Sequence, residues 1–284
     1  MNSFPLVSIC IPTYNGSKFI LESLESAINQ DYLNFEIIIS DDSSNDDTVA
    51  ICKTRLEKTT IPYKVLSHIP SGIGANWNYA IQHSKGTYIK LLFQDDLLSK
   101  SCINKMVLAL ENNESAGLVF CTRTIIFEPS IKNNQWSAKF KTLHNTWGFK
   151  LKENSLINGK QLLGNQKLLD QPLNKIGEPT ATLIRRNCFN KIGYFNNNLV
   201  QALDLEYWYR IMAAYNLVFI NEELVSFRLH EEQQSNKNKK RKIKDFEILP
   251  FILLKKYFWY LNRKVRIRVL KNLLAITFNK HFKK

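Results

Sequence analysis

Two apolar segments of this chain each end in a pair of aspartates, and this feature limits the possible folds more than any other. The run Phe35–Ile39 leads to Asp41–Asp42, and the run over 86–93 leads to Asp95–Asp96. Both runs are rich in β-branched, aromatic and aliphatic residues, which is typical of strands buried in an α/β sheet. Ligands bind beyond the carboxyl ends of parallel strands, so we expect these carboxylates at one sheet edge, where they suit Mg²⁺ or Mn²⁺.

Either pair alone also fits a solvated turn that caps the next helix, because Asp is common at turns and helix starts. After the second pair, Ser99 or Ser101 would be the cap. After the first pair, the adjacent Asp46–Asp47 are better placed as caps. Asp41–Asp42 therefore remain the functional candidates, and two such pairs on one sheet edge are hard to explain by capping alone.

Strand-like and helix-like segments alternate through the first 125 residues, which predicts a doubly wound, largely parallel α/β sheet. The expected strands cover 6–11, 35–39, 63–67, 86–93 and 117–121. Helical spacing of apolar residues marks segments near 20–28, 49–56, 75–84 and 103–110. Further along, we expect a helix near 159–169, a strand over 180–184, a helix beginning at Asp204, and two strands over 217–220 and 224–229.

Composition is that of a globular chain. With 284 residues and 44% hydrophobic content, the chain can bury a sizeable core. Its five cysteines form no CxxC pair, and three lie in apolar runs, so we expect a reducing cytosol. The N-terminal residues predict no signal peptide, and no run approaches the ~18 apolar residues of a membrane span.

The net charge of +14 belongs to the C-terminal segment. Residues 237–284 hold 16 of the 39 Lys and Arg but only 2 of the 25 Asp and Glu. The remainder of the chain is therefore neutral, which argues against a nucleic-acid-binding core.

The order of the short motifs resembles glycosyltransferase family 2. The motifs are Val7–Asn15, Asp41–Thr48, Gln94–Asp96, Gly177–Thr180 and Asp204–Trp208. The resemblance covers roughly residues 5–235. It implies the GT-A fold with a C-terminal helical basic extension, and an inverting, hexosyltransferase-type transfer of a sugar from a nucleotide diphosphate donor, with UDP the expected nucleotide.

The resemblance also implies a donor site. It places Pro12, Tyr14 and Asn15 at the nucleobase, with Asp42 on the edge of the base and Asp41 beside it. An aromatic face stacks on a base, and a carboxylate accepts from a ring N–H, so the residue types agree with these roles. The alternative for Tyr14 is an aromatic residue of a turn.

Asp95 and Asp96 match the family's metal motif, which implies Mn²⁺ or Mg²⁺ on the donor phosphates, with Asp95 also contacting the donor. Many relatives carry a further Asp where this chain has Phe93, and an Arg where it has Trp77. His230 resembles a histidine that adds a metal or phosphate contact, although a structural histidine is an equal alternative.

Asp204 matches the family's catalytic base, which takes a proton from the acceptor hydroxyl. Its alternative role is an N-cap of the following helix, and the two roles are compatible because a helix N-terminus stabilises a carboxylate. On the acceptor side we expect Glu178, with Glu206 secondary, and the exposed-looking Trp136 and Trp147, which lie in an irregular stretch over 129–175.

We therefore expect an inverting glycosyltransferase that extends a surface polysaccharide, lipopolysaccharide or capsule. The alternatives are a non-catalytic nucleotide-sugar-binding module and a sugar nucleotidyltransferase. Intact Asp95, Asp96 and Asp204 argue against the first, and the segment Pro12–Asn15 does not resemble the glycine-rich phosphate loop of the second.

The expected organisation is a GT-A domain over 1–236, with a nucleotide-sugar-binding half over 1–125 and an acceptor-binding half over 126–236. The basic, aromatic-rich, amphipathic extension over 237–284 predicts contact with an anionic membrane surface. The enzyme would then be cytoplasmic and peripheral at the inner face of the cell membrane, with a glycan or lipid-linked glycan as acceptor. A solvated basic helix that packs on the body or contacts a protein partner is the alternative, and nucleic acid is not an expected partner.

Overall fold

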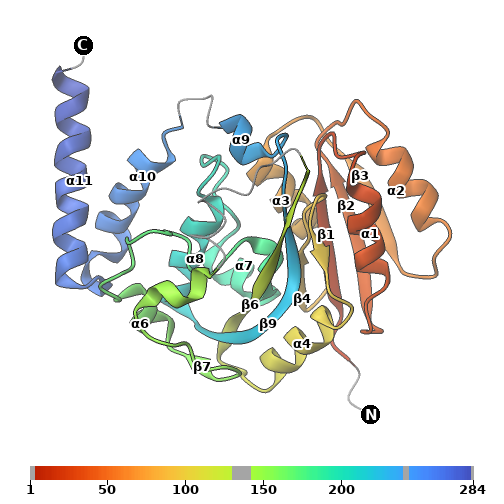
Figure 1. The fold of residues 1–284 in the computed structure, drawn as a ribbon, viewed down its shortest axis with the longest axis horizontal. Coiled ribbons are helices and arrows are strands. Elements are labelled where there is room, and N and C mark those ends of the chain that lie inside the picture. Colours follow the sequence, from red (N-terminus) through yellow and green to blue (C-terminus); the bar gives the residue numbers. More distant parts are fainter. Residues whose placement is uncertain (1–3, 130–141, 239–242, 283–284) are drawn as a thin grey trace.

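The computed structural model describes residues 4–129, 142–238 and 243–282, and its elements are arranged around one large sheet (Figure 1). The strands are β1 (Val7–Thr13), β2 (Phe35–Asp41), β3 (Tyr63–Ser67), β4 (Tyr88–Leu91), β5 (Leu97–Leu98), β6 (Ala116–Phe127), β7 (Leu156–Ile157), β8 (Thr182–Arg185) and β9 (Asn216–Leu229). The α-helices are α1 (Ile20–Ile28), α2 (Thr48–Leu56), α3 (Ile73–Gln82), α4 (Cys102–Glu111), α6 (Gly159–Leu163), α7 (Arg186–Ile192), α8 (Leu203–Ala214), α9 (Gln234–Asn238), α10 (Asp245–Ile252) and α11 (Arg263–Phe282). Short helical turns are η1 (Leu143–Trp147), η2 (Pro179–Ala181), η3 (Leu253–Tyr257) and η4 (Phe258–Tyr260).

The strand order is β3-β2-β1-β4-β8-β6-β9-β5, with β7 paired to β9. Strands β1 to β4 are mutually parallel, β6 and β9 are parallel, and β8 runs antiparallel to both of its neighbours. In this register Thr13 faces Asp41, and the amide of Leu92 bonds to Cys10. The carboxyl ends of β1, β2 and β4 therefore meet at one edge, which confirms the expected placement of the two acidic pairs.

Side chains alternate between two cores, one on each face of the sheet. In β1, Ile9 and Ile11 point toward α1, α2 and α4, whereas Cys10 points toward α3 and α8. Helix α1 forms because Ile20, Leu24 and the small Ala27 recur at helical spacing and are fully buried. The mostly parallel sheet covered by helices on both faces is the predicted α/β architecture.

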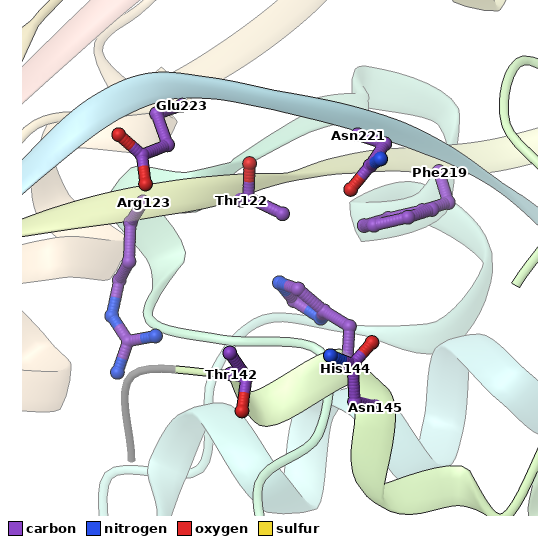
Figure 2. Close-up of a pocket in the computed structure, with 8 residues that line it drawn as sticks. All are labelled: Thr122, Arg123, Thr142, His144, Asn145, Phe219, Asn221 and Glu223. Atoms are coloured by element: carbon purple, nitrogen blue, oxygen red, sulfur yellow. The ribbon is translucent and has the colours of Figure 1, made fainter. Parts of the chain in front are cut away.

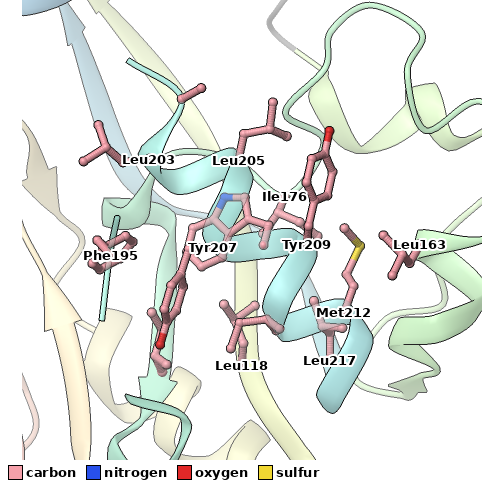
Figure 3. Packing of buried hydrophobic residues seen from close by; sticks show 14 of the residues in the cluster. Leu118, Leu163, Ile176, Phe195, Leu203, Leu205, Tyr207, Tyr209, Met212 and Leu217 are labelled. Atoms are coloured by element: carbon pink, nitrogen blue, oxygen red, sulfur yellow. The ribbon is translucent and has the colours of Figure 1, made fainter. Parts of the chain in front are cut away.

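Helix α8 lies at the centre of the second core (Figure 3). Its aromatic residues Tyr207, Trp208 and Tyr209 are buried there with β6 and β9 side chains such as Leu118 and Leu217. The C-terminal segment joins the same core through one apolar residue per turn or nearly so: Leu249, Leu253, Tyr257, Leu261, Val265, Val269 and Leu273. The segment beyond residue 236 thus packs against the body, and the domain boundary there stays a prediction.

Some element boundaries differ from the prediction. The two strands expected over 217–220 and 224–229 form the single strand β9, because β9 bulges at residues 221–224 opposite Thr122 of β6 and the ladder then continues. The helix expected over 159–169 ends at Leu163, where Gly164 follows. The other expected elements are present, with ends that shift by a few residues.

Candidate active site

Tyr14 stands at the mouth of the sheet edge with 48% of its surface exposed, and Gln94 fixes its backbone. The Tyr14 amide donates to Gln94 Oε1 at 2.8 Å, and Gln94 Nε2 donates back to the Tyr14 carbonyl at 3.1 Å. A Cβ at Gly16 would lie 2.3 Å from the Gln94 side chain, so a larger residue there would push this amide away from Tyr14. Asn15, also exposed, has a left-handed φ of 47° and accepts from the Asn45 amide.

Asp42 bridges two parts of the same edge. Its two carboxylate oxygens accept from the amides of Ser71 and Gly72, at 2.8 and 3.1 Å. It thereby ties the end of β2 to the start of α3, with its side chain almost buried. Pro12 is buried within β1, opposite Ser40.

Asp41 was expected beside Asp42 in the donor site, but its carboxylate does not face an open site. It is buried, and its oxygens accept from the hydroxyls of Thr13 and Ser44 and from the Ser44 amide. Because these donors are the last residue of β1 and a residue of the loop after β2, Asp41 ties that loop to the end of β1.

Asp95 and His230 form a pair across the sheet edge. Asp95 Oδ2 lies 2.8 Å from His230 Nε2, and the His230 ring packs on Phe19 at a centroid distance of 4.8 Å. The other ring nitrogen of His230, Nδ1, is buried without a hydrogen-bond partner among the described residues. The ligand role of His230 therefore stays a prediction, and its Nε2, which faces Asp95, is the nitrogen that could serve it.

Asp96 is a correction to the predicted metal ligands. It is 0% exposed, its Oδ1 accepts from the Arg228 amide at 3.1 Å, and its Oδ2 accepts from the Thr180 hydroxyl at 2.7 Å. Burial, and secondarily the neighbouring Asp95, raise the pKa of Asp96 well above its usual range. Asp96 therefore connects the loop after β4 to β9 and η2, and it has no face open to a metal.

The pair Asp95 and His230 fits a divalent cation only if the substrate supplies further oxygens. In the part of the chain that the structure describes, no three His, Cys, Asp or Glu side chains lie together as a ready metal cluster. A carboxylate and an imidazole with phosphate oxygens and water make a ligand set that suits Mn²⁺ or Mg²⁺. The residues present are thus compatible with a metal that is held jointly by protein and donor.

A pocket of about 440 Å³ opens beside Asp204 in the first turn of α8. Asp204 Oδ2 accepts from Asn174 Nδ2 at 2.8 Å, and Oδ1 accepts from the Leu205 amide at 2.7 Å. Burial, with a contribution from nearby Glu178, raises the pKa of Asp204 to about 7. Asp204 is therefore a half-buried carboxyl that titrates near neutral pH, which is the property of an effective general base. Ala202 occupies the N-cap, so Asp204 is not the cap.

Glu178 lines the same pocket and forms an ion pair with Arg123 at 2.8 Å, and its expected place on the acceptor side stays a prediction. Arg123 comes from β6 and its side chain is almost fully buried. Opposite it, the loop over 171–174 forms another wall. The buried Lys175 holds this loop by donating to the carbonyls of Asp170 and Pro172.

Two predicted acceptor residues do not line this pocket. Glu206 is buried on another side of α8, where its Oε2 accepts from the Arg210 guanidinium at 2.7 Å. Trp147 is 2% exposed and packs in the core near Lys175, so the expectation that it is exposed is wrong. Trp147 was misplaced because an aromatic residue in an irregular stretch can still pack in the core, and Glu206 because its partner Arg210 lies one turn further along α8. Trp136 lies outside the described residues.

A smaller pocket of about 250 Å³ lies between β6, β9 and η1 and shares Arg123 with the larger one (Figure 2). His144 forms its base, with ring nitrogens 2.8 Å from the Lys175 carbonyl and 3.1 Å from the Cys121 carbonyl. Burial lowers the pKa of His144 to about 4, so the imidazole is neutral at physiological pH. Its contacts are those of a side chain that holds η1 against the sheet.

Several site residues escaped the sequence analysis: Gln94, Arg123, Asn174 and Phe246. Gln94 lies within the recognised motif, and its position before two aspartates is the signal that pointed to it. The other three carry no local pattern, because distant segments bring them to the pocket.

The family model described as glycosyl transferase family 2 matches residues 8–193, which is more than half of the chain. The chain belongs to this family. An uncharacterised protein of Mycobacterium tuberculosis is 30% identical over 227 residues, which are 80% of this chain and 67% of that protein. An uncharacterised glycosyltransferase of Rickettsia typhi is 30% identical over 82% of this chain and 66% of its own length. Chondroitin synthase of Escherichia coli is 28% identical over 71% of this chain and 31% of its own length.

Solved glycosyltransferases share the fold at low identity. Residues 1–349 of Staphylococcus aureus TarS with UDP-GlcNAc match with a TM-score of 0.66 and 18% identity, over 98% of this chain and 73% of TarS 1–349. The mannosyltransferase PcManGT of Pyrobaculum calidifontis, with GDP-Man and Mn²⁺, matches with a TM-score of 0.61 and 16% identity, over 97% of this chain and 76% of PcManGT. The family 2 glycosyltransferase thus has the predicted GT-A fold.

The chain spans about two thirds of the length of the first two relatives and about a third of chondroitin synthase. Within the described residues, the longest helix, α11, is too polar to cross a membrane, and the shorter helices do not qualify either.

Proposed function

We propose that this glycosyltransferase transfers a hexose-type sugar with inversion, from a UDP-sugar to a glycan acceptor of surface polysaccharide, lipopolysaccharide or capsule synthesis. The observation that carries the proposal is Asp204, a carboxyl with a pKa of about 7 at the base of a pocket of about 440 Å³. An inverting displacement needs one such base beside the acceptor hydroxyl.

In the proposed reaction the acceptor hydroxyl binds in the pocket and gives its proton to Asp204 as its oxygen attacks the anomeric carbon of the donor. Asn174 and the Leu205 amide orient the carboxylate by donating to its two oxygens. The Glu178–Arg123 pair lines the acceptor side, where its polar atoms suit sugar hydroxyls. The same oxygen that loses its proton forms the new glycosidic bond, and the nucleoside diphosphate leaves.

The donor is proposed to bind along the carboxyl ends of β1, β2 and β4. Tyr14, with an exposed ring, is the candidate to stack on the base, with Pro12, Asn15 and Asp42 around it. UDP is favoured because TarS binds UDP-GlcNAc, although PcManGT binds GDP-Man. A divalent metal held by Asp95 and His230 would neutralise charge on the leaving diphosphate.

The cytoplasmic, peripheral placement is also a proposal. It rests on α11, where Ile267, Leu270, Leu274 and Phe278 form an exposed apolar stripe. These residues lie opposite the buried Val265, Val269 and Leu273, so α11 packs with one face and presents the other. Exposed Lys264 and Lys271 flank the stripe, which is the combination that anionic lipid surfaces attract.

The experiment that tests the proposed function is a screen of the purified full chain against UDP-, GDP- and dTDP-sugars, with and without Mn²⁺. Turnover of a UDP-sugar that requires both a metal and Asp204 supports the proposal. Binding of nucleotide sugars without any turnover would favour a binding module, and release of pyrophosphate would favour a nucleotidyltransferase.

A further inference from the structure

The segment after residue 242 reaches the pocket of about 440 Å³ beside Asp204, called here the transfer pocket, through the first residues of α10. Asp245 is 2% exposed, and one of its oxygens, Oδ2, accepts three backbone amides. The donors are Val200 at 2.9 Å, Gln201 at 2.7 Å and Ala202 at 2.8 Å. Three charge-assisted bonds to one oxygen fix the conformation of these consecutive residues strongly.

These three residues lead directly into α8. Ala202 is its N-cap, and the Ala202 carbonyl accepts the Glu206 amide at 3.0 Å as the helix begins. Asp204 follows two residues later, in the first turn. The carboxylate of Asp245 therefore sets where the helix starts, and so where the base stands.

The next residue of α10 contributes to the pocket itself. Phe246 lines the same pocket as Asp204 and is 49% exposed, so its ring forms an apolar wall open to solvent. Leu249 and Leu253 lie one turn and two turns further on and are buried in the core that contains Tyr209. The start of α10 is thus held both by its apolar residues in the core and by hydrogen bonds from the amides of 200–202.

We propose that the C-terminal segment completes the transfer site, with Asp245 as the positioning residue of Asp204 and Phe246 as a wall that packs against the C–H face of an acceptor sugar. This inference rests on the proposed function. A half-exposed ring beside the polar side chains of Asn174, Glu178 and Asp204 presents both surfaces that a pyranose needs, since a sugar ring has apolar C–H faces and a polar rim of hydroxyls. The basic extension is then part of the catalytic unit as well as the candidate membrane anchor.

The test uses full-length Asp245→Ala, the conservative Asp245→Asn, and Glu247→Ala, which removes the other carboxylate of α10. Backbone hydrogen exchange reports the amides of 200–202, UDP calorimetry reports donor binding, and UDP release from UDP-GlcNAc with water as acceptor reports turnover. We expect Asp245→Ala to expose these amides to exchange and to lower kcat by roughly 10–100-fold, with UDP affinity unchanged, because a small displacement of a catalytic group costs about that much. The pH midpoint of kcat should also move from about 7, since burial of Asp204 sets it.

Asp245→Asn keeps an oxygen that accepts amides and should recover most of the protection and of kcat, and Glu247→Ala should match the wild type. Unchanged exchange at 200–202 in Asp245→Ala would overturn the inference. A parallel loss of UDP affinity and kcat in that variant would also overturn it, because it would show general damage to the fold. If the wild type releases UDP from none of the UDP-sugars, the proposed function fails, and the catalytic part of this inference fails with it. The exchange measurement would still decide whether Asp245 fixes the start of α8.

Discussion

At the scale of single residues, burial gives the four aspartates of this site different tasks. Asp41 and Asp96 are buried and hydrogen-bonded on every side that the structure shows, Asp95 faces His230, and Asp204 borders a pocket. The sequence places three of them just after strands and Asp204 at a helix start, but it does not show which of the four are buried. The role of each aspartate depends on which hydrogen-bond donors the folded chain brings to its carboxylate oxygens.

Asp204→Asn tests the proposed base. The amide cannot take the proton of the acceptor, so we expect transfer to fall by ~10²–10⁴-fold while donor affinity stays within about twofold. In the wild type, the rate should rise with pH through about 7, because the carboxyl acts as a base only when it is ionised. Initial rates between pH 5 and 9, with UDP calorimetry on both proteins, measure this. Transfer by Asp204→Asn at a near wild-type rate would show that another group is the base.

Asp95→Ala and His230→Ala test the proposed metal pair. Each removes one side of the 2.8 Å contact, and we expect each to weaken Mn²⁺-dependent UDP binding by about tenfold or more while metal-free binding changes little. Calorimetry with Mn²⁺ and with EDTA separates the two conditions. Equal Mn²⁺ dependence in wild type and both variants would remove these residues from the metal site.

Asp96 should behave as a structural residue. Asp96→Ala leaves the Thr180 hydroxyl and the Arg228 amide without their acceptor, and each unpaired buried group costs about 1–3 kcal/mol in the free energy of unfolding. Asp96→Asn retains an oxygen and an uncharged group, and burial already favours the neutral form of Asp96, so its cost should be far smaller. Urea unfolding measures both. If the Asp96→Ala variant keeps full stability but loses Mn²⁺-dependent UDP binding, Asp96 is a metal ligand after all.

At the scale of elements, the local patterns predicted the sheet well because the apolar periodicity of each strand and helix is visible in its own residues. The runs at β1, β2 and β4 and the spacing of Ile20, Leu24 and Ala27 in α1 needed no distant partner to be interpreted. The irregular stretch before Asp170 gave no such signal, and Trp147 was misjudged there. Burial of an aromatic residue in a loop depends on which elements cover it, which periodicity does not contain.

The pocket wall formed by α10 is the clearest case of a site that the sequence could not predict. Phe246 and Asp204 are far apart in the chain, and only packing of the C-terminal segment against α8 brings them together. A family resemblance that ends near residue 235 offers no residue to compare with Phe246 or Asp245. The basic composition around them predicted a surface tail, whereas their apolar neighbours Leu249 and Leu253 pack this segment into the core beside α8.

Phe246→Ala tests the contribution of α10 to acceptor binding. Loss of a ring contact of about 1.5 kcal/mol corresponds to roughly a tenfold higher KM for the glycan acceptor. The KM for the donor and the rate of donor hydrolysis, in which water is the acceptor, should stay close to those of the wild type. Phe251→Ala is the matched control, because Phe251 is a similarly exposed phenylalanine of the same helix that does not line the pocket. Equal acceptor KM in the two variants would exclude Phe246 from the acceptor site.

At the scale of the whole molecule, helix α11 lies at the end opposite the outer strand β3 (Figure 1), and it belongs to the C-terminal segment that carries the excess positive charge. Helix α11 stands at that end, and Trp259 just before it is 82% exposed. Because α10 joins this end to the transfer pocket, a membrane that binds α11 would lie near the side from which the acceptor enters. This geometry suits a lipid-linked glycan, whose sugar extends from the bilayer surface into the site.

The membrane role of this end predicts that the full chain floats with vesicles of anionic phosphatidylglycerol and less with neutral phosphatidylcholine. Each Lys or Arg near an anionic surface contributes about 1 kcal/mol, and high salt should weaken the binding because it screens that attraction. The double variant Ile267→Ser and Leu274→Ser removes two side chains from the exposed stripe of α11. We expect it to reduce flotation by about tenfold or more, since each buried aliphatic side chain contributes on the order of 1.5 kcal/mol.

Leu108→Ser is the matched control for this variant, because Leu108 is an exposed leucine of α4 on another part of the molecule. Truncation at Asn236 is a poorer test, since it would also remove Leu249, Leu253 and Val269 from the core. If the wild type fails to float at low salt, or if the double variant floats as well as Leu108→Ser, lipid is not the partner of this surface. A solvated helix or a protein partner would then account for its charge, and the acceptor pocket would face solvent without a bilayer beside it.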